Sequence, residues 1–407
     1  MAYQRWITSL IQASLRERRA TLLVGPRQSG KTTLVKELLP ESIDYRTLDN
    51  LTLLSAAESD PHEFVKRQGD LMVIDEIQRV PELLMAIKME LDRSNDKGQY
   101  LLTGSANIRQ LSTVRESLAG RVAKVRLRPL TQGEITGRQP TFIQDAMQQK
   151  IPAPASHYDR NEVIALALRG GFPEPMTLQE ESRPAWHRDY VNALVDHDLV
   201  DIINIRRRDD MQQLLFVLAA WSSQYIDLNA IQSALSIKRP TLETYLNALE
   251  ALFLFDRLPA YAKTDYARVG KRPKLYMNDS GLMAAILNWD RDRVRLDDQK
   301  LGKLVETFVY NEIASHVSCY SGYQLHHYRD REKREIDLLV ESDRSDLLGI
   351  EVKSGSVVKK EHFKHLAWFR DNLVKKDQSF VGVVLYTGEH LVTFGDRLWA
   401  VPMGCLW

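Results

Sequence analysis

The sequence predicts an α/β protein of several domains, with a parallel-sheet domain first and a second α/β domain last. The 407 residues exceed the size at which one hydrophobic core usually stops growing. Short apolar runs alternate with helical stretches in residues 1–140, and such alternation builds a parallel sheet covered by helices. Residues 158–265 are rich in helical patterns, whereas residues 266–407 mix short strands with helices. We therefore expect three domains with these bounds.

The overall composition is that of an ordinary globular protein. Hydrophobic residues make up 44% of the chain, charged residues 27%, and the formal net charge is +1, so no global field favours nucleic acid or membranes. The two cysteines, Cys319 and Cys405, argue against a disulfide scaffold. The first residues lack the apolar core of a signal peptide, and the longest apolar run, residues 214–221, is too short to span a bilayer. We expect a cytoplasmic protein with no membrane partner.

A glycine-containing segment between the first predicted strand and helix indicates a phosphate site. Residues 20–24 form an apolar run, and GPRQSGKT follows with the spacing GxxxxGK[ST]. Glycine lets the backbone curl around phosphates and aim N–H groups at them. We expect Lys31 to reach the β and γ phosphates of ATP and Thr32 to coordinate Mg²⁺. The predicted nucleotide loop comprises Gly25, Pro26, Arg27, Gln28, Ser29, Gly30, Lys31, Thr32 and Thr33.

A second apolar run, residues 71–74, ends in two carboxylates, Asp75 and Glu76. Ligands of open α/β sheets bind at the carboxyl ends of the strands. We expect Asp75 to hold the Mg²⁺ shell and Glu76 to orient and activate the attacking water. The pair therefore predicts ATP hydrolysis rather than binding alone.

Polar and basic residues beyond a third apolar run, residues 100–103, add candidates for catalysis. Ser105 and Asn107 could sense the γ-phosphate, although Gly, Ser and Asn also form ordinary turns. Arg121 is a candidate arginine finger that acts across a subunit boundary, with Arg109 and Arg115 nearby. A finger supplied by a neighbour predicts a homo-oligomer, whereas an exposed arginine is otherwise solvated surface.

The middle of the chain carries a winged-helix pattern. Residues 228–261 predict a helix, a turn at residues 236–238, a second helix that accepts Pro240 in its first turn, and a strand. Lys238 and Arg239 open the second helix, where a recognition helix approaches DNA, although winged helices also contact proteins. The basic runs at 206–208 and 268–274 are further candidates for phosphate contacts or are solvated turns.

An acidic constellation lies near the carboxyl end. Asp337 lies on one predicted strand, while Glu351 and Lys353 share one face of the next, so the three converge. Glu306 on a predicted helix adds another acid. As metal ligands, Asp337 and Glu351 could bind Mg²⁺ or Mn²⁺. Lys353 could stabilise or deprotonate the water that attacks a phosphodiester of DNA or RNA. Alternating Glu and Lys is also common on a solvated strand face.

These motifs resemble one prokaryotic family. GPRQSGKTTL, LMVIDEIQRVPELL, LLTGSAN and ESLAGR are similar to AAA-type P-loop ATPases with an amino-terminal domain of the AAA_14 kind. KRPKLYMNDSGL, LGKLVETFVYNEI and EIDLLVE with IEVKSG resemble their DUF4143 region, and the order Glu306, Asp337, Glu351, Lys353 resembles the PD-(D/E)xK nucleases. The resemblance covers nearly the whole chain. It implies an ATPase joined through a winged helix to a restriction-endonuclease-like domain.

The chain departs from the family at residues 196–198, where Asp-His-Asp stands in place of an acid followed by Arg-Asp. If that arginine touches a phosphate or a neighbouring subunit, this chain relies on another residue. Two functions stay open. In one, ATP hydrolysis moves a domain that binds or cuts nucleic acid in DNA processing or defence. In the other, a nucleotide-dependent switch or scaffold docks protein partners and its nuclease-like fold is inert.

Overall fold

The computed structural model describes residues 3–39, 43–67, 69–105, 120–154, 156–199, 208–235, 237–262 and 271–407. The chain forms two compact units. The first unit comprises Met1–Pro129, Asp198–Asn204 and Glu243–Leu254, and the second comprises Leu130–His197, Ile205–Leu242 and Phe255–Trp407. The predicted middle and carboxyl-terminal domains thus fall largely in one unit, and the main segment of the first unit ends at Pro129 rather than at residue 140.

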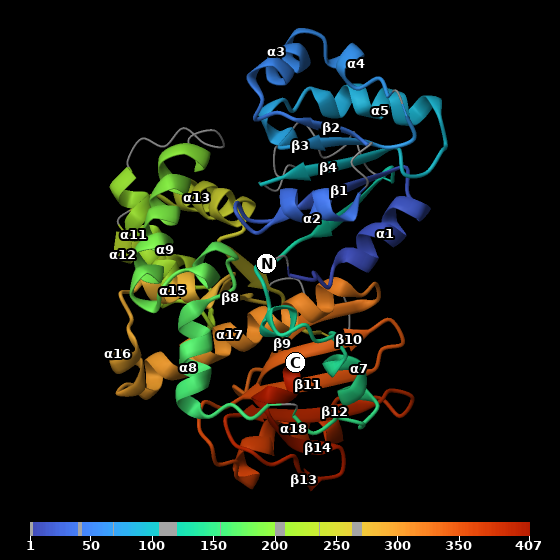
Figure 1. The fold of residues 1–407 in the computed structure, drawn as a ribbon. Helices are drawn as coiled ribbons and strands as arrows, with labels where there is room; N and C mark the ends of the chain where they lie inside the picture. Colours follow the sequence, from blue (N-terminus) through green and yellow to red (C-terminus); the bar gives the residue numbers. More distant parts are fainter. Residues whose placement is uncertain are drawn as a thin grey trace. The chain divides into compact units, whose positions relative to one another are not determined.

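The first unit is built on a five-stranded parallel sheet with the order β2-β3-β4-β1-β5 (Figure 1). The predicted parallel sheet is confirmed. Its apolar runs correspond to β1, β3 and β4, whereas β2 and β5 contain charged residues and were not apparent as apolar runs. The strands are β1 (Ala20–Val24), β2 (Asp44–Thr47), β3 (Met72–Asp75), β4 (Tyr100–Gly104) and β5 (Val122–Arg126).

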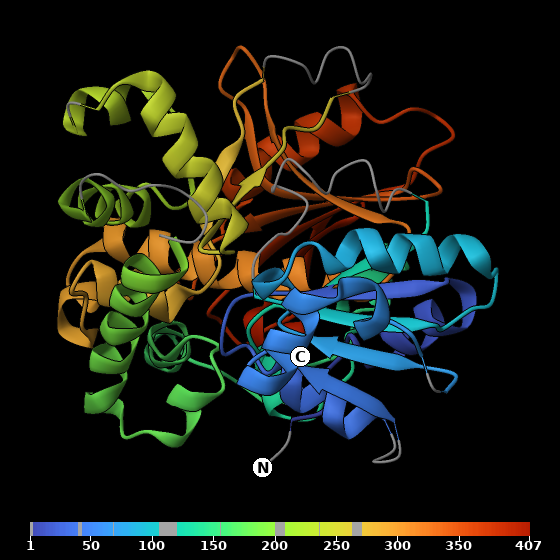
Figure 2. The same ribbon diagram turned by 90° about the horizontal axis from the view of Figure 1, so that it is seen from above.

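Helices cover both faces of this sheet because successive strand residues point to opposite sides. Leu22 and Ile74 belong to one apolar core, and their neighbours Leu23 and Val73 belong to the other. The first core also receives α3, α4 and α5, and the second receives α1 and α2 (Figure 2). The helices of this unit are α1 (Thr8–Glu17), α2 (Lys31–Leu38), α3 (Leu51–Ser59), α4 (Pro61–Phe64), the 3-10 turn η1 (Ile77–Arg79) and α5 (Leu83–Arg93).

The second unit begins with a helical layer. Within it, α15 (Ser280–Ile286) is almost wholly buried and contacts α8 (Arg160–Arg169), α9 (Arg183–Ala193) and α11 (Arg208–Ala220). A three-stranded antiparallel sheet has the order β6-β8-β7. The strands of this sheet are β6 (Gln224–Tyr225), β7 (Phe255–Leu258) and β8 (Lys274–Met277). The other α-helices that precede the carboxyl-terminal part of this unit are α6 (Gln132–Ile135), α7 (Phe142–Met147), α12 (Leu228–Leu235), α13 (Arg239–Ala251) and α16 (Arg291–Arg295). Helix α13 continues into the first unit at Glu243.

The carboxyl-terminal part of the second unit is a six-stranded mixed sheet with the order β13-β14-β12-β11-β10-β9. Strands β11, β12 and β14 run parallel, and β9 and β10 are antiparallel to their neighbours. Helix α17 lies on one face and α18 on the other (Figure 1). The elements are α17 (Asp298–Cys319), β9 (Tyr323–Arg329), β10 (Glu335–Ser342), β11 (Leu347–Val352), α18 (Lys364–Asn372), β12 (Phe380–Tyr386), β13 (Val392–Gly395) and β14 (Leu398–Pro402).

The predicted strands at residues 335–341, 347–352 and 380–386 correspond to β10, β11 and β12. Strands β9 and β13 both contain exposed residues. Neither forms an apolar run, so the sequence did not predict them as strands. Among the residues described by the structure, no helix combines the length and apolarity that crossing a membrane requires.

Candidate functional site

The loop between β1 and α2 is tightly held against neighbouring strands. Gly30 adopts a left-handed conformation, with φ 93°, and so does Gln28, with φ 59°. A Cβ atom on Gly25 would lie 2.2 Å from the carbonyl oxygen of Leu127, so a larger residue would displace backbone. The Gly25 N–H donates to the Gly104 carbonyl at 3.3 Å. Glycine at position 25 therefore lets the loop lie against the ends of β4 and β5.

Lys31 opens α2 and reaches back over this loop. Its ammonium donates to the carbonyls of Gly25 at 3.1 Å and Pro26 at 2.9 Å, and the residue is only 4% exposed. Arg27, Gln28 and Thr33 are exposed, whereas Ser29 is buried. The structure thus places the Lys31 charge at the loop where the sequence predicts phosphates.

Asp75, at the carboxyl end of β3, is the centre of a buried hydrogen-bond network. Its carboxylate accepts from the Thr32 hydroxyl at 2.9 Å, from the Tyr45 hydroxyl at 2.6 Å and from the Thr103 hydroxyl. Because the Thr32 proton points to Asp75, the lone pairs of Thr32 Oγ1 are available to a cation. Burial and the bond to Asp75 raise the pKa of Tyr45, so Tyr45 remains a donor. Thr32 and Asp75 therefore offer oxygen atoms of the kind that Mg²⁺ prefers.

Glu76 follows Asp75 in a left-handed backbone conformation, with φ 59° and ψ 44°. This conformation is strained for a residue with a Cβ, and such strain tends to occur at functional sites. The Glu76 N–H donates to Thr103 Oγ1 at 3.2 Å, and the Gln78 amide donates both to the Glu76 carboxylate and, at 2.8 Å, to Ser105 Oγ. Since β4 lies between β1 and β3, Ser105 at its end comes next to Glu76.

The structure thus gathers Lys31, Thr32, Asp75, Glu76 and Ser105 at the carboxyl ends of three adjacent strands. Their catalytic roles stay predictions. Sequence reasoning missed Tyr45, Thr103 and Gln78, although Thr103 and Gln78 lie inside the quoted motifs LLTGSAN and DEIQ. Asn107, Arg109 and Arg115 lie outside the described residues.

Arg121 makes a two-pronged ion pair within its own unit. Its guanidinium reaches the two carboxylate oxygens of Asp92 at 2.5 and 3.2 Å. This pair would have to open before Arg121 could act across a subunit boundary. Its role as an arginine finger stays a prediction.

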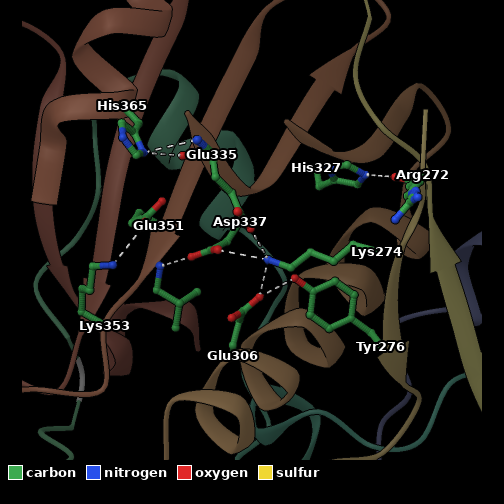
Figure 3. A network of polar contacts seen from close by, with 11 residues as sticks. Arg272, Lys274, Tyr276, Glu306, His327, Glu335, Asp337, Glu351, Lys353 and His365 are labelled. Atoms are coloured by element: carbon green, nitrogen blue, oxygen red, sulfur yellow. Dashed lines mark hydrogen bonds and ion pairs between the residues drawn. The ribbon is translucent and has the colours of Figure 1, made fainter. Parts of the chain in front are cut away.

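The acidic residues of the second unit converge on one end of the β10–β11 pair (Figure 3). The Val352 N–H donates to Asp337 Oδ2 at 2.9 Å, and the Lys353 ammonium donates to Glu351 Oε1 at 2.9 Å. Burial and nearby Asp337 raise the pKa of Glu351 to about 8, against the opposing effect of Lys353. The predicted convergence of Asp337, Glu351 and Lys353 agrees with this geometry.

A lysine that sequence reasoning did not assign to this cluster lies at its centre. The Lys274 ammonium, on β8, reaches Glu306 Oε1 at 2.7 Å, Glu335 Oε1 at 3.0 Å and Asp337 Oδ1 at 3.2 Å (Figure 3). Burial alone would lower the pKa of Lys274. The carboxylates of Glu306, Asp337 and Glu335 and the Tyr276 hydroxyl raise this pKa well above the ordinary lysine value. Lys274 is therefore a buried ammonium ion.

This position corrects one prediction. The basic run at residues 268–274 was expected to be a surface phosphate contact or a solvated turn, but Lys274 is only 2% exposed and is paired with carboxylates. Residues 268–270 lie outside the described residues. Arg272 is exposed and pairs with Asp227 at 3.0 Å.

The predicted divalent cation at Asp337 and Glu351 does not fit this arrangement. Lys274 pairs with Asp337 Oδ1, the Val352 N–H donates to Asp337 Oδ2 and Lys353 donates to Glu351 Oε1, so of these carboxylate oxygens only Glu351 Oε2 has no hydrogen-bond partner among the described residues. In the described part of the chain, no group of three or more His, Cys, Asp and Glu residues is arranged to hold a metal ion. Burial raises the pKa of Glu306 to about 7. The Lys274 charge lowers this pKa and the Asp337 charge raises it.

Comparison with known proteins matches three regions of the chain. Residues 17–136 match an AAA domain (AAA_14), residues 160–293 match a domain of unknown function (DUF8612), and residues 301–406 match another (DUF4143). Two uncharacterised proteins, from Mycobacterium tuberculosis and Mycobacterium bovis, are each 29% identical over 399 residues, which cover 96% of this chain and 82% of the relative.

Comparison with solved structures finds partial similarity to a Walker-type ATPase and to a branch migration motor. A Walker-type ATPase of Pyrococcus abyssi aligns with 69% of this chain and 94% of its own, at 14% identity and a TM-score of 0.43. The RuvB Holliday junction branch migration motor of Thermotoga maritima aligns with 62% of this chain and 89% of its own, at 20% identity and a TM-score of 0.28. The matches confirm the two regions that the motifs indicated, an AAA-type P-loop ATPase domain within residues 17–136 and a DUF4143 region within residues 301–406.

Proposed function

We propose that the first unit hydrolyses ATP in a Mg²⁺-dependent reaction at the loop of residues 25–32. The observation that carries this proposal is the Asp75 network, in which Thr32 donates to Asp75 while Glu76 lies beside it. Thr32 and Asp75 would hold Mg²⁺, which neutralises phosphate charge. The loop N–H groups and Lys31 would bind the β and γ phosphates.

Glu76 is the proposed base. Its carboxylate accepts a proton from water as the water oxygen approaches the γ-phosphorus, and the bond from the γ-phosphorus to the bridging oxygen of ADP breaks. The Gln78 amide links Glu76 to Ser105, so these side chains form one polar wall that can orient the water. Lys31 stabilises the charge on the transferred phosphoryl oxygens.

Substitution of Lys31 tests this proposal directly. Lys31→Ala should lower Mg²⁺-dependent phosphate release from ATP by at least about 100-fold, because a preorganised charge is lost at the phosphates. Lys97→Ala is the control, since Lys97 is an exposed lysine of the same unit outside the Asp75 network. A folded Lys31→Ala variant that hydrolyses ATP at the parent rate would contradict the proposed site.

A winged helix is proposed for the elements from α11 to β8, of which α13 lies mostly in the first unit, and a nuclease-like fold is proposed for the carboxyl-terminal part of the second unit. The element order α11-β6-α12-α13-β7-β8, with β8 between β6 and β7, supports the winged helix. The order α17-β9-β10-β11-α18-β12, with Asp337 and Glu351 on adjacent strands, supports the nuclease-like fold. Fold alone does not establish cleavage.

Lys274 favours binding over metal-dependent cleavage as the role of the second unit. A metal-dependent nuclease needs its carboxylates for cations, whereas these carboxylates already hold an ammonium ion. We therefore propose that ATP hydrolysis controls a binding surface of the second unit. Homo-oligomerisation through Arg121 is retained as a proposal, which needs the pair with Asp92 to open.

Nucleic acid is the proposed ligand of that surface because Lys238 and Arg239 are exposed where α13 begins. If both contact phosphates, Lys238→Ala should weaken DNA binding uniformly across sequences and reduce the slope of log affinity against log salt by about 1. Lys376→Ala, which removes an exposed charge elsewhere in the unit, is the control. An unchanged salt slope in the Lys238 variant would instead favour protein docking.

A further inference from the structure

Four acidic residues of the second unit form what we call the carboxylate cluster: Glu306, Glu335 and Asp337, which contact Lys274, and Glu351, which lies on the strand next to Asp337. A lysine ammonium has three N–H donors. Lys274 has three oxygen partners at 2.7, 3.0 and 3.2 Å, one from each of Glu306, Glu335 and Asp337. Each donor is therefore matched to a different carboxylate, and Glu351 is paired separately with Lys353.

The backbone of Lys274 is fixed by the middle strand of a sheet. On one side Lys274 pairs with Tyr225 of β6, and on the other it pairs with Leu258 of β7. Its ammonium also lies 5.9 Å from the centre of the Tyr225 ring and 5.7 Å from that of Tyr276. Aromatic faces within about 6 Å attract a cation. The surroundings of Lys274 thus favour a cation from several directions.

A divalent cation and this ammonium compete for the same oxygens. Ca²⁺ and Mg²⁺ bind oxygen ligands at roughly 2.0–2.6 Å, so a metal shared by Glu306 and Asp337 would overlap the space that Lys274 Nζ fills. A lysine driven out of these contacts but still buried would lose its charge partners at a large cost. Because β8 is the middle strand and is paired on both sides, it cannot shift as an edge strand could to take Lys274 away from the carboxylates.

We propose that the Lys274 ammonium is the resident cation of the carboxylate cluster and excludes divalent metal ions from it. The nuclease-like arrangement of Glu306, Asp337, Glu351 and Lys353 is then held together by an internal ion network instead of a metal. Removal of the lysine charge exposes a latent metal site. This inference is independent of ATP hydrolysis, because it concerns residues outside the nucleotide loop and is tested without nucleotide.

The test compares Mn²⁺ binding to the nucleotide-free full chain in the parent and three single variants, by electron paramagnetic resonance of free Mn²⁺ and by thermal unfolding. The parent and Asp337→Asn should bind the same number of ions, because the cluster takes none in the parent. Lys274→Met keeps the length and apolar contacts of the side chain but removes its charge, and it should bind about one additional Mn²⁺ per chain. Lys271→Met is the matched control, because Lys271 is an exposed lysine outside the cluster.

Stability gives a second readout. Without metal, Lys274→Met should unfold at a lower temperature than the parent, since three carboxylates lose their common partner. Mn²⁺ should raise the unfolding temperature of Lys274→Met but not that of the parent or of Lys271→Met. Addition of Asp337→Asn to Lys274→Met should remove this metal response.

Two results would overturn the proposal. One is a parent that binds a Mn²⁺ ion which Asp337→Asn abolishes, because the cluster would then hold metal despite Lys274. The other is a folded Lys274→Met variant that gains neither an ion nor a metal-dependent rise in unfolding temperature. If Lys274→Met does not fold even with Mn²⁺, the comparison of the parent with Asp337→Asn still decides the question. ATPase activity in the parent has no bearing on either result.

Discussion

Glu76→Gln is expected to bind Mg²⁺ and ATP as the parent does while losing ATP hydrolysis by roughly 100-fold or more. Glutamine keeps the size of the side chain and an oxygen for the bond from Gln78, but it cannot take a proton from water. Asp75 and Thr32 are unchanged, so the Mg²⁺ ligands remain. Titration calorimetry with ATP and single-turnover phosphate release measure binding and hydrolysis separately.

The matched control for this prediction is Glu82→Gln. Glu82 is exposed and precedes α5 in the same unit, so its substitution removes one charge without touching the Asp75 network. Parallel loss of ATP binding and hydrolysis in Glu76→Gln would mean that Glu76 supports the nucleotide site rather than the chemistry. Hydrolysis at the parent rate would leave Glu76 without the role of base.

The grouping of Lys31, Thr32, Asp75 and Glu76 in the candidate site was predictable because its parts are local in the sequence. The loop of residues 25–32 follows β1 directly, and Asp75 and Glu76 end the apolar strand β3. Each motif therefore combines a strand, recognised by its apolar run, with the residues at its carboxyl end. The strand order was not predictable in this way, because nothing in the apolar runs shows that β4 lies between β1 and β3.

Lys274 shows what sequence reasoning could not reach. Its partners Glu335 and Asp337 lie 61 and 63 positions further along the chain, and their contact depends on how two different sheets approach each other within one unit. The local sequence RVGKRPK reads as a solvated basic turn. The sequence did carry one indication that Lys274 is buried, because this lysine begins the apolar strand β8. A charge on a buried strand needs partners of opposite charge.

Glu312 provides the last prediction, because it is a buried acid without a full set of partners. It lies on α17 and is 3% exposed. Its Oε1 accepts from the Gln132 N–H at 2.9 Å, whereas its Oε2 is buried without a hydrogen-bond partner among the described residues. Burial raises the pKa of Glu312 to about 8, the Gln132 bond and Arg169 lower it, and Glu134 raises it.

A raised carboxyl pKa makes the folded protein less stable as pH increases. From the ordinary Glu pKa of 4.5 up to about 8, the folded state keeps a proton that the unfolded state has released. Folding must therefore take up a proton, which costs roughly 3 kcal/mol at pH 7 relative to pH below 4.5. Glu312→Gln removes this cost, because glutamine does not titrate and its oxygen can still accept from Gln132.

The free energy of unfolding of Glu312→Gln should thus rise relative to the parent by roughly 3 kcal/mol between pH 4.5 and pH 7, and the gap should level off above pH 8. Denaturant unfolding across this range measures it. Any cost of burying the amide where Oε2 lacks a partner is independent of pH, so the change of the gap with pH is the decisive quantity. Glu361→Gln, at an exposed glutamate, should show no such change. A constant gap for Glu312→Gln would mean that Glu312 is ionised in the folded protein and that Arg169 outweighs its burial.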